Sequence, residues 1–157
     1  MIAHRQSPRH LRADRSGASA VEFALIAGLL TSLLFGALDI YGAYAMNLAL
    51  EQAAGRTAQL VTAPGTVALS YANLPNEATS AYGEPVESVA TKNWLECDGV
   101  AQPSFTGSCS TTAQTARYVS IILTDEYVPI MGWGRLMSGH GPNNGLMLTG
   151  DAVVRIQ

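Results

Sequence analysis

Charged side chains are scarce in this 157-residue chain. Asp, Glu, Lys and Arg make up 13% of the residues, against roughly 25% in an average soluble domain. Four of the nine basic residues precede the first long apolar run: Arg5, Arg9, Arg12 and Arg15. The remaining cations are few and scattered, so we expect no nucleic-acid partner.

The sequence also lacks the common patterns of catalytic and metal sites. It has no glycine-rich phosphate loop, GxSxG turn, HExxH helix or EF-hand spacing. His4 and His10 lie near the start, and we interpret His140, alone in a glycine-rich loop, as a solvated residue. We interpret the adjacent acids Asp125 and Glu126 as solvated strand-end residues, with a calcium site as the alternative. The sequence therefore predicts a structural protein rather than an enzyme, without cofactor or metal.

Only two cysteines are present, Cys97 and Cys109. The eleven residues between them are too many for a CxxC redox or zinc pair. If this part of the chain lies outside the cytoplasm, we expect a disulfide between them. Two independent buried thiols are the alternative.

What the chain does have is a long apolar helix pattern. Phe23–Leu38 contains no charged residue over 16 positions, which span about 24 Å as a helix. A bilayer core requires about 30 Å, so we predict a transmembrane helix over residues 18–44. Glu22 and Asp39 would then lie near opposite interfaces. We interpret Asp39 as a solvated residue at the helix end, with contact to a partner helix as the alternative.

The flanking residues predict the orientation and the extent of this helix. The basic residues 1–17 favour a cytoplasmic N-terminus and a periplasmic C-terminal part. The helical pattern continues without proline through residues 45–63, until Pro64-Gly65. We therefore expect one helix that is half in lipid and half outside it.

The start of the helix resembles a type IV prepilin processing site. Gly17 follows the basic leader, and Glu22-Phe23 follow after four small or apolar residues. The resemblance implies cleavage between Gly17 and Ala18 by the prepilin peptidase, which leaves a product with net charge −6 (5 basic and 11 acidic residues). Glu22 would neutralise the new α-amine of a neighbouring helix. The alternative is an ordinary acid favoured by the helix dipole.

A longer stretch resembles the TadE family, the pseudopilins of the tight-adherence (Tad/Flp) pilus. The resemblance is carried by Gly17–Leu25, Phe35-Gly36 and Asn47–Arg56. It implies a minor pilin or pseudopilin of the inner membrane that takes part in assembly or initiation of the Flp type IVb pilus. The implied partners are the membrane, the prepilin peptidase, other pilin-like subunits and the Tad inner-membrane assembly platform. The protein would remain at the membrane or reach the pilus on the cell surface.

One face of the apolar helix is suited to packing against other helices. Small residues recur at every fourth position and follow Phe23: Ala24, Gly28, Ser32 and Gly36. Small residues at this spacing let membrane helices approach closely. We expect this face to contact other pilin-like helices, although glycine is also common in membrane spans generally.

The remaining residues, 64–157, predict a small periplasmic α+β domain. We expect a short helix over 76–82 and strands over 86–95, 117–124 and 146–156. In the second strand Val119, Ile121 and Leu123 face one way, toward a core. Residues 131–145 form a long glycine-rich loop whose Trp133 and Met137 fold back on the sheet or contact a partner. The predicted fold is a pilin-like spine helix on an antiparallel sheet of about three strands.

Two other protein classes are compatible with parts of this pattern. Ala43-Tyr44-Ala45 could be a signal-peptidase site that releases a secreted binding protein from Met46. Such a signal would be longer than the usual 15–30 residues and would leave Glu22 unexplained. An uncleaved membrane-anchored binding protein, enzyme or sensor is the third class. The mature N-terminus distinguishes the three: Ala18, Met46 or Met1.

Overall fold

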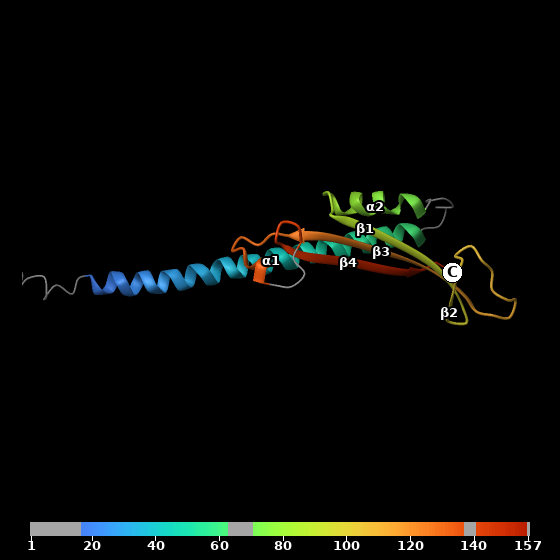
Figure 1. Cartoon of the computed structure of the whole chain (residues 1–157), viewed down its shortest axis with the longest axis horizontal. Coiled ribbons are helices and arrows are strands. Elements are labelled where there is room, and N and C mark those ends of the chain that lie inside the picture. The colour runs from blue at the N-terminus through green and yellow to red at the C-terminus, as the bar shows by residue number, and fades with distance from the viewer. Residues whose placement is uncertain (1–16, 63–70, 137–140, 157) are drawn as a thin grey trace, which may run out of the picture. The chain divides into compact units, whose positions relative to one another are not determined.

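The computed structural model describes residues 17–62, 71–136 and 141–156. Its elements (Figure 1) are α1 (Ala18–Thr62), η2 (Tyr71–Asn73), α2 (Leu74–Tyr82), β1 (Ser88–Cys97), β2 (Val100–Gln102), β3 (Thr115–Tyr127), η3 (Trp133–Leu136) and β4 (Leu146–Arg155). The predictions for His4, His10, Pro64-Gly65, Met137 and His140 fall outside the described residues. The chain divides into two compact units between Leu38 and Asp39.

The first unit is the N-terminal half of α1. Its helix begins directly after Gly17, whose carbonyl accepts a hydrogen bond from the Val21 amide at 3.2 Å. Nearly every side chain from Ala18 to Leu38 is exposed, including all the large apolar ones. The helix is long and apolar enough to cross a membrane by length and composition. An apolar helix that its own unit does not cover needs an apolar environment or partner helices.

The second unit contains an antiparallel four-stranded sheet in the order β2-β1-β3-β4. The predicted α+β fold, with the apolar helix packed on a small antiparallel sheet, is confirmed. The strand that was not predicted is β2, which pairs with the end of β1 through the Asp98-Gly99 turn. Both turn residues have positive φ (52° and 80°), as in the type I′ turns that close two-residue hairpins. The Asp-Gly dipeptide is therefore a hairpin signal in this sequence.

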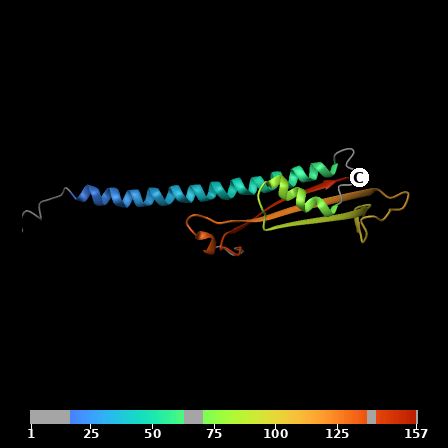
Figure 2. The ribbon, with the colours of Figure 1, turned by 90° about the horizontal axis from the view of Figure 1, so that it is seen from above.

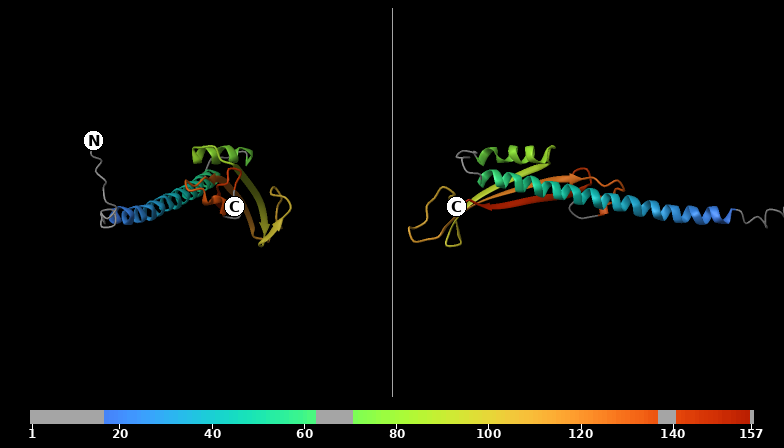
Figure 3. Two further views of the ribbon diagram at one scale, coloured as in Figure 1. Left: turned by 60° about the vertical axis from the view of Figure 1, so that its left-hand side comes forward. Right: turned by 180° about the vertical axis from the view of Figure 1, so that it is seen from behind.

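One face of the sheet packs on the helices. The predicted inward residues of β3, Val119, Ile121 and Leu123, are at most 1% exposed. They form one cluster with residues of α1 and α2: Leu50, Ala53, Ala54, Ala58, Leu74 and Ala78. Figures 2 and 3 show α2 and the later half of α1 over the same face of the sheet. Alternation along β3 thus separates this buried face from the opposite face of the sheet.

Helix and sheet approach each other closely at Gly150 in β4. A Cβ atom at this position would overlap the backbone of Leu50 and Glu51 in α1. Gly150 is buried, and the neighbouring inward positions Leu148 and Ala152 pack at the edge of the core. The missing side chain at Gly150 therefore lets the backbone of α1 lie directly on β4.

The disulfide predicted between Cys97 and Cys109 is present. Its Cα atoms lie 5.6 Å apart, and it links the end of β1 to the loop that leads into β3. Arg117 supports the same loop by donating to the carbonyls of Phe105 (3.2 Å) and Gly107 (2.8 Å). Closing a loop of about a dozen residues contributes about 3 kcal/mol in the chain-entropy model. The disulfide and Arg117 thus hold a segment that has no regular secondary structure.

Candidate functional site

The predicted processing and assembly residues lie at the exposed start of α1. Gly17 forms a turn, Ala18 is the first helical residue, and Glu22 is exposed in the second turn. Phe23 is 71% exposed. A peptidase or a neighbouring helix can therefore reach this segment without displacing any other described part of its unit.

The small-residue stripe lies on the same exposed helix. Cβ atoms built at Gly28 and Gly36 would meet nothing within 4 Å. The hydroxyl of Ser32 donates to the Leu29 carbonyl at 2.8 Å, and that of Thr31 donates to the Ala27 carbonyl at 2.7 Å. These two hydroxyls are satisfied within the helix, so neither presents an unpaired donor to lipid or to a partner helix.

Asp39, the first residue of the second unit, is fully buried, so the prediction of a solvated residue is wrong. Its Oδ1 accepts from the Ile130 amide (2.7 Å) and the Tyr127 hydroxyl (3.4 Å). Its Oδ2 accepts from the Met131 amide (3.1 Å) and the Trp133 indole (3.0 Å). The Asp39 carboxylate therefore links helix α1 to the segment that follows β3.

Gly42 makes room for the aromatic partner in this arrangement. A Cβ atom at Gly42 would overlap the ring and hydroxyl of Tyr127. The absent side chain lets the tyrosine lie against α1, one turn from Asp39. Burial raises the pKa of Tyr127, and the charge of Asp39 and the hydrogen bond to it raise the pKa further. The phenol therefore stays protonated as a donor to Asp39.

A second acid holds the other end of the glycine-rich loop. Glu126 accepts from the amide and side chain of Asn143 (2.9–3.1 Å) and from the Gly145 amide at 2.6 Å. Its neighbour Asp125 accepts from the Tyr82 hydroxyl of α2 at 3.3 Å. The prediction that both acids are solvated strand-end residues is incomplete, because both are half-buried and each carboxylate binds a different part of the fold. In the part of the chain that the structure describes, no group of three His, Cys, Asp or Glu could hold a metal.

Tyr82 makes the stability of this domain sensitive to high pH. Burial, followed by the charge of Asp125, raises the pKa of Tyr82 from 10.0 to about 12. The unfolded chain therefore loses this proton first, so the contribution of Tyr82 is complete below pH 10 and is lost as the pH rises through about 12. Denaturant unfolding of the full chain between these pH values should show falling stability. The fall should be shallower in Tyr82→Phe, and an equal fall in both proteins would contradict this assignment.

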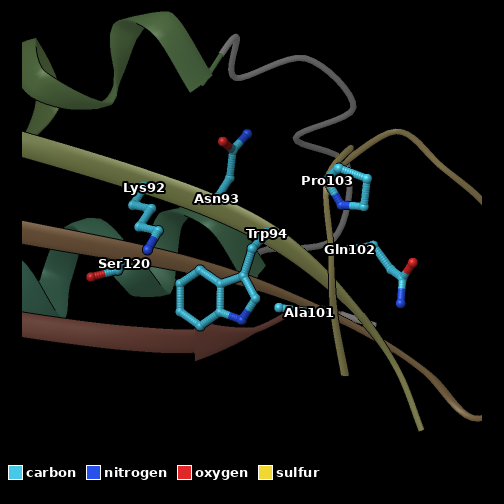
Figure 4. A pocket seen from close by; sticks show the side chains of 7 residues that line it. All are labelled: Lys92, Asn93, Trp94, Ala101, Gln102, Pro103 and Ser120. Carbon is cyan, nitrogen blue, oxygen red and sulfur yellow. The ribbon is translucent and has the colours of Figure 1, made fainter. Parts of the chain in front are cut away.

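The opposite face of the sheet carries a shallow hollow (Figure 4), lined by Lys92, Asn93, Trp94, Ala101, Gln102, Pro103 and Ser120. Trp94 stacks on Tyr118 with ring centroids 5.2 Å apart, and its indole donates to Glu96 at 2.8 Å. The Lys92 ammonium lies 5.9 Å from the Trp94 ring. Trp94 thus contacts Tyr118, Glu96 and Lys92 at this hollow.

Comparison with known proteins identifies the N-terminal segment. Residues 17–59 match a family model described as TadE-like protein, so the resemblance to this family is confirmed. The match covers most of α1 and ends before the sheet. No curated protein and no solved structure matches the chain.

Proposed function

We propose, from the TadE-like segment at residues 17–59, that this protein is a minor pilin or pseudopilin of a tight-adherence (Flp type IVb) pilus. It would take part in assembly or initiation of the pilus from the inner membrane. The observation that carries the proposal is that the matched residues include the whole exposed apolar half of α1, residues 18–38. The role would be structural, through helix–helix contacts, and not catalytic.

The proposed membrane arrangement has four parts. Residues 1–17 form a cytoplasmic leader, residues 18–44 cross the inner membrane, and residues 45–63 continue the helix outside it. Residues 64–157 would lie in the periplasm, where a disulfide between Cys97 and Cys109 is chemically favoured. Subunits that leave the membrane for the fibre would carry this domain to the pilus surface.

Maturation would occur by cleavage between Gly17 and Ala18. The exposure of this segment supports access by a prepilin peptidase. The new α-amine at Ala18 would then pair with Glu22 of an adjacent subunit. Phe23 and the stripe of Ala24, Gly28, Ser32 and Gly36 would supply the packing surface for other pilin-like helices and the Tad assembly platform.

The mature N-terminus tests this proposal. We expect mass spectrometry of the protein from cells that make the prepilin peptidase to find Ala18 as the first residue. Gly17→Val should abolish cleavage, because a side chain obstructs close approach of the peptidase to this backbone. The matched control is Gly28→Ala, whose added methyl group meets open space and should not affect maturation. Wild-type protein that begins at Met1 or Met46, or normal maturation of Gly17→Val, would refute the proposal.

A further inference from the structure

A short segment after β3 directs large apolar side chains outward. Residues 127–134 contain no Asp, Glu, Lys or Arg. Val128, Ile130 and Met131 are 55%, 69% and 49% exposed. We call residues 128–133 the base loop. Adjacent exposed apolar side chains on an otherwise uncharged loop are typical of a surface that contacts something other than water.

Asp39 determines where the base loop lies along α1. The amides of Ile130 and Met131 bind its two carboxylate oxygens at 2.7 and 3.1 Å. Asp39 directly follows the 16-residue uncharged run Phe23–Leu38. The base loop is therefore held beside the residue at which the helix leaves its purely apolar stretch.

Two tyrosines lie on the side of α1 opposite Asp39, within about one and a half turns of it. Successive helical residues are about 100° apart, so Tyr41 and Tyr44 lie about 200° and 140° around the helix from Asp39. They are 70% and 67% exposed, and Ile40 between Asp39 and Tyr41 is 68% exposed. Tyrosine is enriched at membrane–water interfaces. The tyrosines therefore lie on the side of α1 opposite Asp39 and the base loop, so both of these sides present apolar or aromatic side chains.

The polar backbone of the base loop is compatible with an apolar environment. The amides of Ile130 and Met131 and the Trp133 indole are bound to Asp39. The Gly132 amide donates to the Pro129 carbonyl at 3.1 Å. A loop near lipid must satisfy its donors internally. These three backbone amides and the indole are all satisfied.

We propose that the base loop inserts Val128, Ile130 and Met131 into the headgroup–acyl boundary on the outer side of the bilayer. This inference rests on the proposed membrane anchoring by α1. It gives the outer domain a second lipid contact, and Asp39 couples that contact to the anchor helix. The domain would then sit directly on the membrane surface with a restricted orientation before assembly.

Site-specific fluorescence in vesicles tests this proposal. The full-length protein with Ile130→Cys, labelled with an environment-sensitive dye, is reconstituted in phosphatidylcholine–phosphatidylglycerol vesicles at a low protein-to-lipid ratio. The native cysteines are paired in the disulfide and do not compete for the label. The dye should emit at shorter wavelength than in water and should be quenched by shallow nitroxide lipids, at a depth of about 5–10 Å into the boundary. Val128→Cys should give the same result.

Two further label positions make the outcome decisive. Val100→Cys in β2, which is 64% exposed, should remain unquenched, and Leu33→Cys in the anchor helix should be quenched by deep nitroxides. If the dye at residue 130 behaves like that at residue 100 while residue 33 is quenched, the base-loop proposal is wrong and the membrane anchor stands. If residue 33 is also unquenched, both proposals fail. Shielding of residue 130 only after other pilin-like subunits are added would identify a protein partner and overturn the lipid contact.

Discussion

Replacement of Glu22 by Gln is expected to weaken association with other pilin-like subunits by more than about a hundredfold. The proposed cleavage after Gly17 would create a positive amine at Ala18, which would need a nearby carboxylate in a packed helix bundle. Removing one partner of a buried ion pair costs about 3–5 kcal/mol, because the remaining charge stays uncompensated. At about 1.4 kcal/mol per tenfold change, this loss exceeds a hundredfold in the association constant. Glu22→Ala should have a similar effect, while insertion and cleavage remain largely intact.

Co-purification with the neighbouring pseudopilin and the major pilin, together with pilus counts on cells, measures this effect. Glu51→Gln is the matched control, because Glu51 is an exposed acid on the same helix outside the apolar run. It should leave both readouts near the wild-type level. Wild-type association and pilus numbers for Glu22→Gln would mean that Glu22 is an ordinary residue of the helix N-terminus. The pilin proposal would then depend on the cleavage site and the family match.

Replacement of Asp39 by Ala should release the base loop from α1. Four donors would lose their acceptor: the Ile130 and Met131 amides, the Trp133 indole and the Tyr127 hydroxyl. Each buried donor left without a partner costs about 1–3 kcal/mol. A local loss of about 3 kcal/mol corresponds to roughly a hundredfold faster amide exchange where exchange follows local opening. Asp39→Asn should resemble Ala, since its amide group would place a donor against donors.

Hydrogen–deuterium exchange of the full-length protein in nanodiscs measures this release. Exchange at Ile130 and Met131 should accelerate strongly, while the β3 core around Ile121 should change little. Asp151→Asn is the control, because this exposed acid in β4 lies outside the Asp39 cluster. Unchanged protection at Ile130 and Met131 in Asp39→Ala would show that the loop is held by packing alone.

Glu22 and Asp39, two of the three acids of α1, show what local sequence patterns can and cannot predict. Glu22 could be singled out because its spacing from Gly17 and its neighbour Phe23 form a local pattern. Asp39 has no such local signal, because its partners lie 88 to 94 residues later in the chain. The available hints were the uncharged segment around Trp133 and a glycine one turn after Asp39. Neither feature shows, from the sequence alone, that Asp39 contacts the segment around Trp133.

The amino-acid sequence by itself determined the apolar helix, the inward face of β3 and the TadE-like segment. Each of these depends on periodicity or spacing within a few dozen residues. Only the tertiary structure decided that Asp39 binds the base loop and that Glu126 binds the loop around Asn143. It also decided that the backbone of α1 packs against Gly150, where a side chain would not fit. These contacts join residues that are distant in the chain. A carboxylate can accept these hydrogen bonds, and a glycine can allow close packing, only after folding has brought the partner beside it. Local patterns thus specified the elements, while burial and hydrogen-bond pairing between elements specified how the sheet and its loops are held to α1.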